Sequence, residues 1–391
     1  MRPSLDRART TRYDDITRIL RDPATFSSRD CLPSLRPPTG IEDPETLAAT
    51  AIRGVMICDD PPVHTRQRGI YGEAFAAPRV AAMEPMVREV VDGLIDGFAD
   101  GRADLVGDFA YPLPLIVILR LIGVPEHDMD DCREWTQDLM RLHFVPGLTE
   151  HEKEAAIRGA VAFHRYARDL VETRRANPGN DFVSRLLSTS SRGHQPLAPA
   201  ELVESLPGLI LAGHETTANM IGNLLQLLLT RPDLRAQLAR SPEMAAEVVE
   251  EALRLDNSVL GLARTTTRDV EVGGVMIPRG ARLTVLFASG NHDEARFPDA
   301  ATFRTDRRSQ PPHLAFGRGI HYCVGAPLAR LELRVSAERL LRRLPELRLS
   351  EPDFVPEQNR AYQMRGPARL PVSWDPPLSA TASPGGPTIA V

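Results

Sequence analysis

Apolar residues recur at the period of an α-helix over most of the first two-thirds of the chain. Residues 13–21 form one amphipathic segment of this kind, which stops before Pro23. Residues 32–62 are rich in proline, so we predict an irregular segment there. The helical period predicts further helices at residues 63–75, 79–99, 128–143, 151–176, 180–187, 201–229, 233–239 and 242–255.

The pattern changes after about residue 256. Residues 264–289 carry alternating β-branched positions with Gly-Gly and Arg-Gly turns, which predict short strands and hairpins. A long helix is predicted at residues 324–343, and one last hairpin at residues 361–374. The chain shows no internal repeat and no linker, so we expect a single domain over residues 1–375. Residues 376–391 are rich in Pro, Gly, Ser and Ala and are expected to be disordered.

Composition and charge exclude several classes of protein. The net charge is −5 with a pI near 6.1, which disfavours a nucleic-acid binder that relies on bulk positive charge. The polar N-terminus is unlike a signal peptide. The longest apolar stretch, Phe109–Val124, is interrupted by Pro112, Pro114 and Arg120, whereas a membrane helix needs about 20 apolar residues. We therefore expect a soluble, cytoplasmic protein.

The four cysteines are widely spaced and include no C-x-x-C pair, so a zinc knuckle or a redox dithiol is unsupported. Four cysteines in a chain of 391 residues also do not suggest a disulfide scaffold, and a reducing cytoplasm fits. Cys31, Cys58 and Cys132 are interpreted as small buried apolar residues.

Cys323 lies in a different setting, the segment FGRGIHYCVG at residues 316–325. Gly317 and Gly319 permit a tight turn whose amide groups can point inward. Cys323 would lie at the start of the 324–343 helix, where the helix dipole and free amides favour a thiolate. Such a thiolate is a nucleophile or a metal ligand.

This segment strongly resembles the haem-binding loop of the cytochrome P-450 family, the haem-thiolate monooxygenases. The resemblance implies a haem b whose iron is ligated by the Cys323 thiolate, which pushes electron density onto bound oxygen. It also implies that His321 donates to a haem propionate. The fixed positions of the family pattern F-x-x-G-x-(R/H)-x-C-x-G are Phe316, Gly319, His321, Cys323 and Gly325, and Gly317 is assigned to the same loop.

A second motif, GLILAGHETT at residues 208–217, lies inside the long apolar 201–229 helix. Ala212 and Gly213 leave room beside the helix, and Thr216 is expected on the same face, with its hydroxyl able to bond back to a carbonyl. The family motif (A/G)-G-x-(D/E)-T is matched through Glu215 and Thr216. The resemblance implies that this acid and alcohol deliver protons over the distal haem face.

Two further motifs of this sequence match motifs of the family and occur in the same order along the chain. His64 and Arg68, four residues apart on a helix, can face one anion. By resemblance they bind haem propionates together with Arg264. Glu251 and Arg254 form an E-x-x-R pair, a pattern that surface salt bridges share. The resemblance implies a buried, structural pair behind the haem, with a third partner that is Arg307 or its neighbour Arg308.

The expected fold is mainly α with a small β region, with the haem between the 201–229 helix and the 324–343 helix. The resemblance covers residues 11–375, although family members usually carry 40–50 residues before this segment and only ten precede it here. We expect an apolar substrate pocket. Its predicted lining is part of residues 33–55 together with Phe144, Val145, Leu148, Leu209, Ala212, Val259, Leu260, Leu262 and Met364.

The function implied is insertion of one oxygen atom from O2 into an apolar or amphipathic small molecule, as a tailoring step of secondary metabolism. Electrons would come from an external ferredoxin and its reductase. Arg330, Arg334 and Arg318 are candidates for the docking face, and a solvated arginine face is the alternative. Two other functions remain open. One is a peroxide-using peroxygenase, although such relatives replace the acid–alcohol pair with arginine and proline, and the other is a non-catalytic haem sensor.

Overall fold

Helices form most of the computed structural model, which describes residues 7–29, 31–32, 38, 40–52, 55–98, 101–145, 147–190, 195–307, 309–358 and 363–375. The expected disordered tail and Arg308 lie outside these residues. The longer helices are α1 (Tyr13–Arg21), α3 (Val63–Ala74), α5 (Glu84–Asp96), α6 (Pro112–Ile122), α7 (Met129–Phe144), α8 (Glu150–Ala176), α10 (Pro199–Leu229), α11 (Pro232–Arg240), α12 (Ala245–Leu255) and α14 (Ala326–Arg343). Shorter ones are α2 (Pro44–Thr50), α4 (Ala77–Ala81), α9 (Phe182–Ser188) and α13 (Phe287–Asn291).

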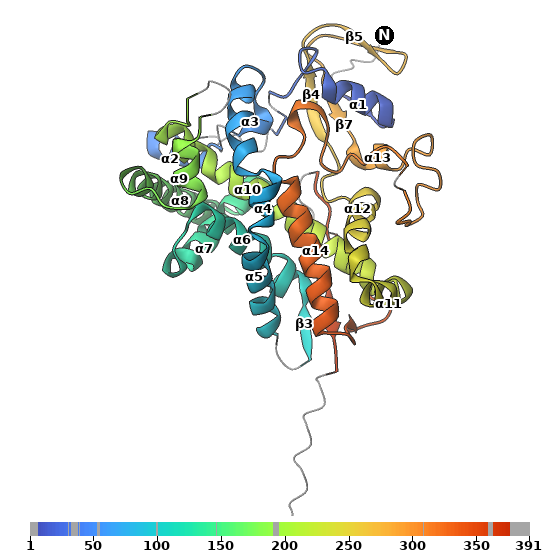
Figure 1. The fold of residues 1–391 in the computed structure, drawn as a ribbon. Helices are drawn as coiled ribbons and strands as arrows, with labels where there is room; N and C mark the ends of the chain where they lie inside the picture. The colour runs from blue at the N-terminus through green and yellow to red at the C-terminus, as the bar shows by residue number, and fades with distance from the viewer. Residues whose placement is uncertain are drawn as a thin grey trace, which may run out of the picture.

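Helix α10 is the centre of the main core. It is apolar around most of its circumference, which is the pattern of a buried helix. It packs against α6, α7, α8 and α14, and Figure 1 shows α14 crossing it near the middle of the molecule. The position of any group on α10 is therefore fixed by packing on several sides.

Three small sheets accompany the helices. The largest has the strand order β1-β7-β4-β2, in which β1 runs parallel to β7 and the other neighbours are antiparallel. Together with α1 and α13 it forms one end of the molecule (Figure 1), around a second apolar cluster. The strands are β1 (Arg7–Thr10), β2 (Phe26–Ser27), β4 (Leu262–Thr266) and β7 (Arg282–Val285) in this sheet, β5 (Val270–Val272) and β6 (Val275–Ile277) in a hairpin, and β3 (Arg102–Asp104), β9 (Pro371–Ser373) and β8 (Arg348–Leu349) in the third.

Most predicted helices are present, and the differences have local causes. The predicted helix 79–99 is two helices, α4 and α5, separated at Ala82 and Met83. The stretch that prolines were expected to interrupt is α6, because Pro112 and Pro114 lie in its first turn, where a missing N–H costs no helical bond. Within the segment expected to be irregular, the Asp43 carboxylate accepts from the Thr46 amide and caps α2.

The predicted hairpin at residues 361–374 is wrong. Met364 instead bridges to Val259, an isolated antiparallel bridge joins Gln358 to Pro367, and β9 pairs with β3 and with the preceding strand β8. The pairings of Met364 with Val259 and of β9 with β3 join segments far apart in the sequence, so no local pattern could indicate them.

Leu105–Ile122 is long and apolar enough to cross a membrane by length and composition alone. In the structure 67% of this window is buried, and α6 packs against α10 and α5. It is therefore placed as a helix of the protein core.

A buried ion cluster ties the end of α12 to the loop that follows α13. The Arg254 guanidinium, 1% exposed, donates from Nε and Nη2 to the Glu251 carboxylate at 2.8 and 2.7 Å. It also donates to the carbonyls of Asn291 and Ala300 at 2.8 Å. Arg307 Nε donates to Glu251 Oε1 at 3.0 Å, so the triad expected with Arg307 is present as a geometry.

We predict that Arg254→Met lowers the free energy of unfolding by about 3–5 kcal/mol, because it leaves the Glu251 carboxylate buried with only part of its partners. Urea denaturation followed by circular dichroism measures the change. The exposed Arg240→Met at the end of α11 is the matched control and should change stability by less than about 0.5 kcal/mol. Equal stability of the two variants would show that the cluster does not hold the loop.

Candidate active site

One stripe of α10 is open although the helix lies in the core. Ala212 is exposed and Leu209, Gly213 and Thr216 are half-buried, whereas most neighbouring positions are buried. These four residues follow the i, i+3, i+4, i+7 spacing of a single helix face. Exposed surface at the centre of a packed helix means that this face borders an internal hollow.

The loop before α14 faces inward as well. Gly317 and Gly319 adopt left-handed φ angles of 67° and 70°. A Cβ at position 319 would lie 2.0 Å from the Leu20 carbonyl oxygen, so the loop can approach α1 only with glycine there. The turn is closed by the Cys323 amide, which donates to the Phe316 carbonyl at 2.9 Å. This geometry fixes where the Cys323 side chain points.

Cys323 has exposed surface, unlike the other three cysteines, which are buried or half-buried. Even so, burial within the protein is the largest influence on the pKa of its thiol. The side chain therefore faces an enclosed space rather than bulk water. Burial raises its pKa, against hydrogen bonds from the amides of Gly325 and Ala326 and the nearby charges of Arg68 and Arg330. The helix start alone thus does not produce the thiolate that the sequence suggested. A metal cation at the sulfur would supply the missing stabilisation.

Four cationic or ring-nitrogen side chains converge near this loop. His64 and His321 lie with ring centroids 4.2 Å apart, and the Nε2 atoms of both are buried without a hydrogen-bond partner. Arg264, 3% exposed, donates to the carbonyl of its neighbour Ala263. Arg68 donates to the Tyr322 carbonyl.

Burial, reinforced by Arg264, His64 and Arg68, lowers the pKa of His321 to about 3. Burial and Arg68 also lower the pKa of His64. A buried group of donors with excess positive charge and two unpartnered ring nitrogens is suited to an anion. The carboxylates of a haem meet that requirement, so these residues fit the cofactor that the sequence suggested.

The acid and the alcohol of α10 are both held in place. The Thr216 hydroxyl donates to the Ala212 carbonyl at 2.7 Å, and the Ser258 hydroxyl donates to the Thr216 carbonyl at 2.8 Å. Glu215 is 6% exposed, and the Asn219 amide donates to its Oε1 at 3.0 Å and to its carbonyl at 2.9 Å. Sequence reasoning missed Asn219 and Ser258. The i, i+4 spacing could have indicated Asn219, but nothing local marks Ser258.

Part of the predicted pocket lining is assembled beside this helix. The Leu260 amide donates to the Gln363 carbonyl at 2.9 Å, and Val259 forms a β-bridge with Met364. Ser258 connects this pair of segments to α10 at Thr216. Val259, Leu260 and Met364 are thus brought together, with Leu262 following in β4 and Leu209 on the open stripe of α10.

Phe144, Val145 and Leu148 lie at and after the end of α7. Phe144 packs against the main core, and Val145 is 49% exposed. Within the described part of the chain, no hydrogen bond or ring contact joins these three residues to the open stripe of α10. Residues 33–37, 39, 53 and 54 of the predicted 33–55 lining lie outside the described residues.

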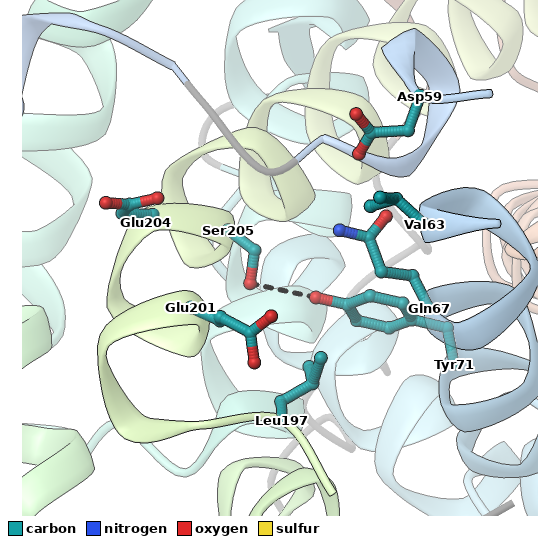
Figure 2. A pocket seen from close by; sticks show the side chains of 8 residues that line it. All are labelled: Asp59, Val63, Gln67, Tyr71, Leu197, Glu201, Glu204 and Ser205. Atoms are coloured by element: carbon teal, nitrogen blue, oxygen red, sulfur yellow. Dashed lines mark hydrogen bonds between the residues drawn. The ribbon is translucent and has the colours of Figure 1, made fainter. Parts of the chain in front are cut away.

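A separate cavity of about 180 Å³ lies between α3 and the N-terminal part of α10. The Tyr71 hydroxyl donates to Ser205 Oγ at 2.9 Å across this space, and the Glu201 carboxylate points toward it (Figure 2). Glu204 also lines the cavity. Burial raises the pKa of Tyr71 to about 12, so its hydroxyl remains a donor. None of the residues that hold Cys323 or the cationic group lines this cavity, so it is distinct from the hollow.

The three arginines suggested for partner docking are engaged within the chain. Arg330 donates to the Glu250 carboxylate at 2.6 and 2.9 Å, and Arg334 pairs with Glu84 and Glu338. Arg318 donates to the Pro312 carbonyl. The charges of Arg330 and Arg334 are therefore compensated by carboxylates, whereas the carbonyl to which Arg318 donates is neutral.

Comparisons with known proteins agree with this geometry. The family model described as Cytochrome P450 matches residues 133–241 and 242–367. The mycinamicin IV hydroxylase/epoxidase of Micromonospora griseorubida is 37% identical over 368 residues, which cover 93% of this chain and 88% of that protein. The vitamin D(3) 25-hydroxylase of Pseudonocardia autotrophica is 36% identical and covers 94% and 87%.

A ligand-free structure of cytochrome P450 TbtJ1 superposes with a TM-score of 0.83 at 34% identity, covering 96% of this chain and 93% of that one. The predicted fold, mainly α with a small β region, is confirmed. Family membership carries with it a cysteine-ligated haem b, for which Cys323 is the ligand, and a requirement for redox partners. The chain belongs to the cytochrome P450 family and is a monooxygenase of that family.

Proposed function

We propose that the hollow between α10 and the Cys323 loop holds the haem and that its α10 side receives an apolar or amphipathic small molecule. The observation that carries this proposal is the open stripe of α10, where apolar Leu209 and Ala212 share one face with Thr216. Bound haem supplies the activation of dioxygen. The protein supplies binding, orientation and proton transfer.

The cationic side chains have a holding role in this proposal. Arg264 and Arg68 bind the haem carboxylates, and His64 and His321 contribute their buried, unpartnered Nε2 atoms to the same site. Phe316, Gly317 and Gly325 shape the loop around Cys323. The buried Glu251, Arg254 and Arg307 keep the neighbouring segments in position and take no part in the chemistry.

Glu215 and Thr216 are proposed to transfer protons into the hollow. The Glu215 carboxylate is the ionisable group, and Asn219 fixes one of its oxygens. The Thr216 hydroxyl lies one residue further along the helix on the open stripe, beside Gly213. General acid catalysis depends on this geometry before it depends on pKa.

The wider biochemical setting is also a proposal. Relatives named as a hydroxylase/epoxidase of mycinamicin IV and as a monooxygenase of Streptomyces venezuelae support a tailoring step of secondary metabolism. We propose an external ferredoxin and ferredoxin reductase as the electron source. The four free thiols and the burial of Leu105–Ile122 support a cytoplasmic location. A ligand panel scored by displacement of iron-bound water tests the substrate class.

Cys323→Ser is predicted to lose the thiolate signature, because a hydroxyl is a poor anionic ligand for iron. The purified protein is reduced and exposed to carbon monoxide, and its Soret band is recorded. Cys132→Ser, a buried position of α7 whose neighbours are Asp128 and Tyr166, should keep the red-shifted band. A Cys323→Ser protein that keeps this band would overturn the ligand assignment.

Arg264→Met is expected to speed transfer of haem to apomyoglobin about tenfold, because a hydrogen bond to a charged group contributes about 1.5–3 kcal/mol. Arg279→Met is the control, since Arg279 is an exposed residue of a turn. An unchanged transfer rate would remove Arg264 from the cofactor site.

Thr216→Ala should still bind haem and substrate and should still consume reducing equivalents. Product formed per electron pair should fall, with hydrogen peroxide released instead, because misplaced proton delivery diverts the oxygen chemistry. Thr216→Ser restores a hydroxyl and should recover most of the product yield, whereas Glu215→Gln should slow turnover itself.

Product and peroxide are measured together, with a surrogate ferredoxin system under dioxygen. A fully coupled Thr216→Ala protein would contradict the role given to this hydroxyl. If both the Thr216→Ala and the Glu215→Gln variants match the parent enzyme, a peroxygenase or a haem sensor is favoured.

A further inference from the structure

Two cysteines that the sequence separates by 27 residues are in contact. Cys31, in the loop after β2, and Cys58, at the end of a short 3-10 helix (Met56–Cys58), place their Sγ atoms 3.3 Å apart. A disulfide needs an S–S distance of about 2.05 Å, so the two atoms must approach by about 1.3 Å. A small movement of the two side chains would therefore bring the sulfur atoms to the distance of a disulfide bond.

Contacts that do not involve sulfur hold the two segments together. The Asp60 carboxylate accepts from the Ser27 hydroxyl at 2.5 Å and from the Ser28 amide at 2.9 Å. These bonds join the end of β2 to the residues just before α3, on either side of the cysteine pair. The docking of the segments is therefore already present before any S–S bond forms.

The two thiols differ in their surroundings. Cys31 is 1% exposed, and its Sγ also lies 3.3 Å from the Ile57 carbonyl, which can accept the thiol proton. Cys58 is only half-buried, and its sulfur accepts a hydrogen bond from the Leu32 amide. The hydrogen bond between the two thiols, together with that amide and nearby Arg264, lowers the pKa of Cys58.

The same hydrogen bond and burial raise the pKa of Cys31 well above its ordinary range. Thiolate character and exposure therefore both make Cys58 the thiol that an oxidant attacks first. Cys31, already in contact with it, is the thiol that resolves the product.

We propose that Cys31 and Cys58 form a reversible disulfide when the protein meets hydrogen peroxide. In the first step the Cys58 thiol and hydrogen peroxide give a sulfenic acid and one water. In the second step the Cys31 sulfur attacks the Cys58 sulfur, the S–S bond forms, and the hydroxyl leaves as a second water. The two thiols lose two electrons in total, and the peroxide is reduced to water.

Disulfide formation would act on the haem-binding residues through Arg264. The ionisable groups that act on this buried guanidinium are Cys31, Cys58 and Asp60. A disulfide cannot ionise, so the bond removes both ionisable sulfurs beside Arg264 and leaves Asp60 and an anion of the haem as the groups that can balance its charge. It also fixes the residues that lead into α3, the helix that carries His64 and Arg68. This consequence rests on the proposed role of Arg264, whereas disulfide formation does not.

The haem-loaded protein is treated with small equivalents of hydrogen peroxide, then alkylated and mapped by mass spectrometry. We expect a linked peptide containing Cys31 and Cys58, two of the four thiols protected from alkylation, and full reversal by dithiothreitol. Cys132→Ser should behave in the same way. Cys31→Ser should instead accumulate a Cys58 sulfenic acid that dimedone traps. Oxidation of Cys58 without a link to Cys31, or a link between other cysteines, would overturn the proposal.

Haem transfer to apomyoglobin supplies the second readout, with the Soret absorbance confirming that peroxide has not destroyed the haem. The oxidised protein should lose haem about threefold more slowly than the reduced protein, because the bond fixes the residues that lead into α3. Cys58→Ser should lose haem at one rate before and after peroxide. If the disulfide forms and the rate is unchanged, the link from the pair to the haem site is wrong, while the Cys323→Ser spectrum still tests the proposed function separately.

Discussion

Buried positive charge at the edge of the hollow is the constraint on which the rest of the site depends. His64 and Arg68 come from α3, Arg264 from β4 and His321 from the cysteine loop, so three elements bring their donors to one place. An isolated charge inside a protein costs several kcal/mol unless a partner compensates it. The ionisable groups that act on Arg264 are the thiols of Cys31 and Cys58 and the carboxyl group of Asp60, so only one of the three is a carboxylic acid. An anionic cofactor therefore completes the fold electrostatically as well as supplying chemistry, and binding and folding are linked.

The opposite wall of the hollow depends on a close approach of backbone to helix. A Cβ at Gly366 would lie 2.3 Å from Asn219 Oδ1, so glycine lets the C-terminal segment pass against α10 at the residue that holds Glu215. Asn223 repeats the arrangement one turn later and donates to the carbonyls of Asp256 and Arg365. The residue that fixes the active-site acid therefore packs against a segment that is remote in sequence. This is the reason that the wall is built of amides and hydroxyls rather than of apolar packing alone.

The sequence predicts a feature well when the residues that form it lie close together along the chain. Short stretches of sequence determine both the turn around Cys323 and the pairing of Glu251 with Arg254. The local residue pattern is therefore sufficient to predict these two features. The contact of Cys31 with Cys58 was missed because their spacing resembles no known pair motif and depends on how β2 docks before α3. Ser258 was missed for the same reason. The predicted last hairpin was wrong because Pro367 pairs with Gln358, before the predicted bounds, and the other partners of its residues lie in β3, β8 and the segment before β4.

The arginines of α14 near the Cys323 loop show that the number of arginines in a sequence is a poor guide to the net charge of a surface. Arg330 lies over the Phe316 ring at 4.6 Å from its centroid and pairs with Glu250. Burial would raise the pKa of Glu250, but His313 and Arg330 lower it to about 2, so this carboxylate stays ionised and the pair stays neutral overall. Arg330 therefore stabilises the cysteine loop through its contact with the Phe316 ring and its ion pair with Glu250. Because long-range steering depends on uncompensated charge, these arginines contribute more to the rigidity of the ligand loop than to the attraction of an acidic partner.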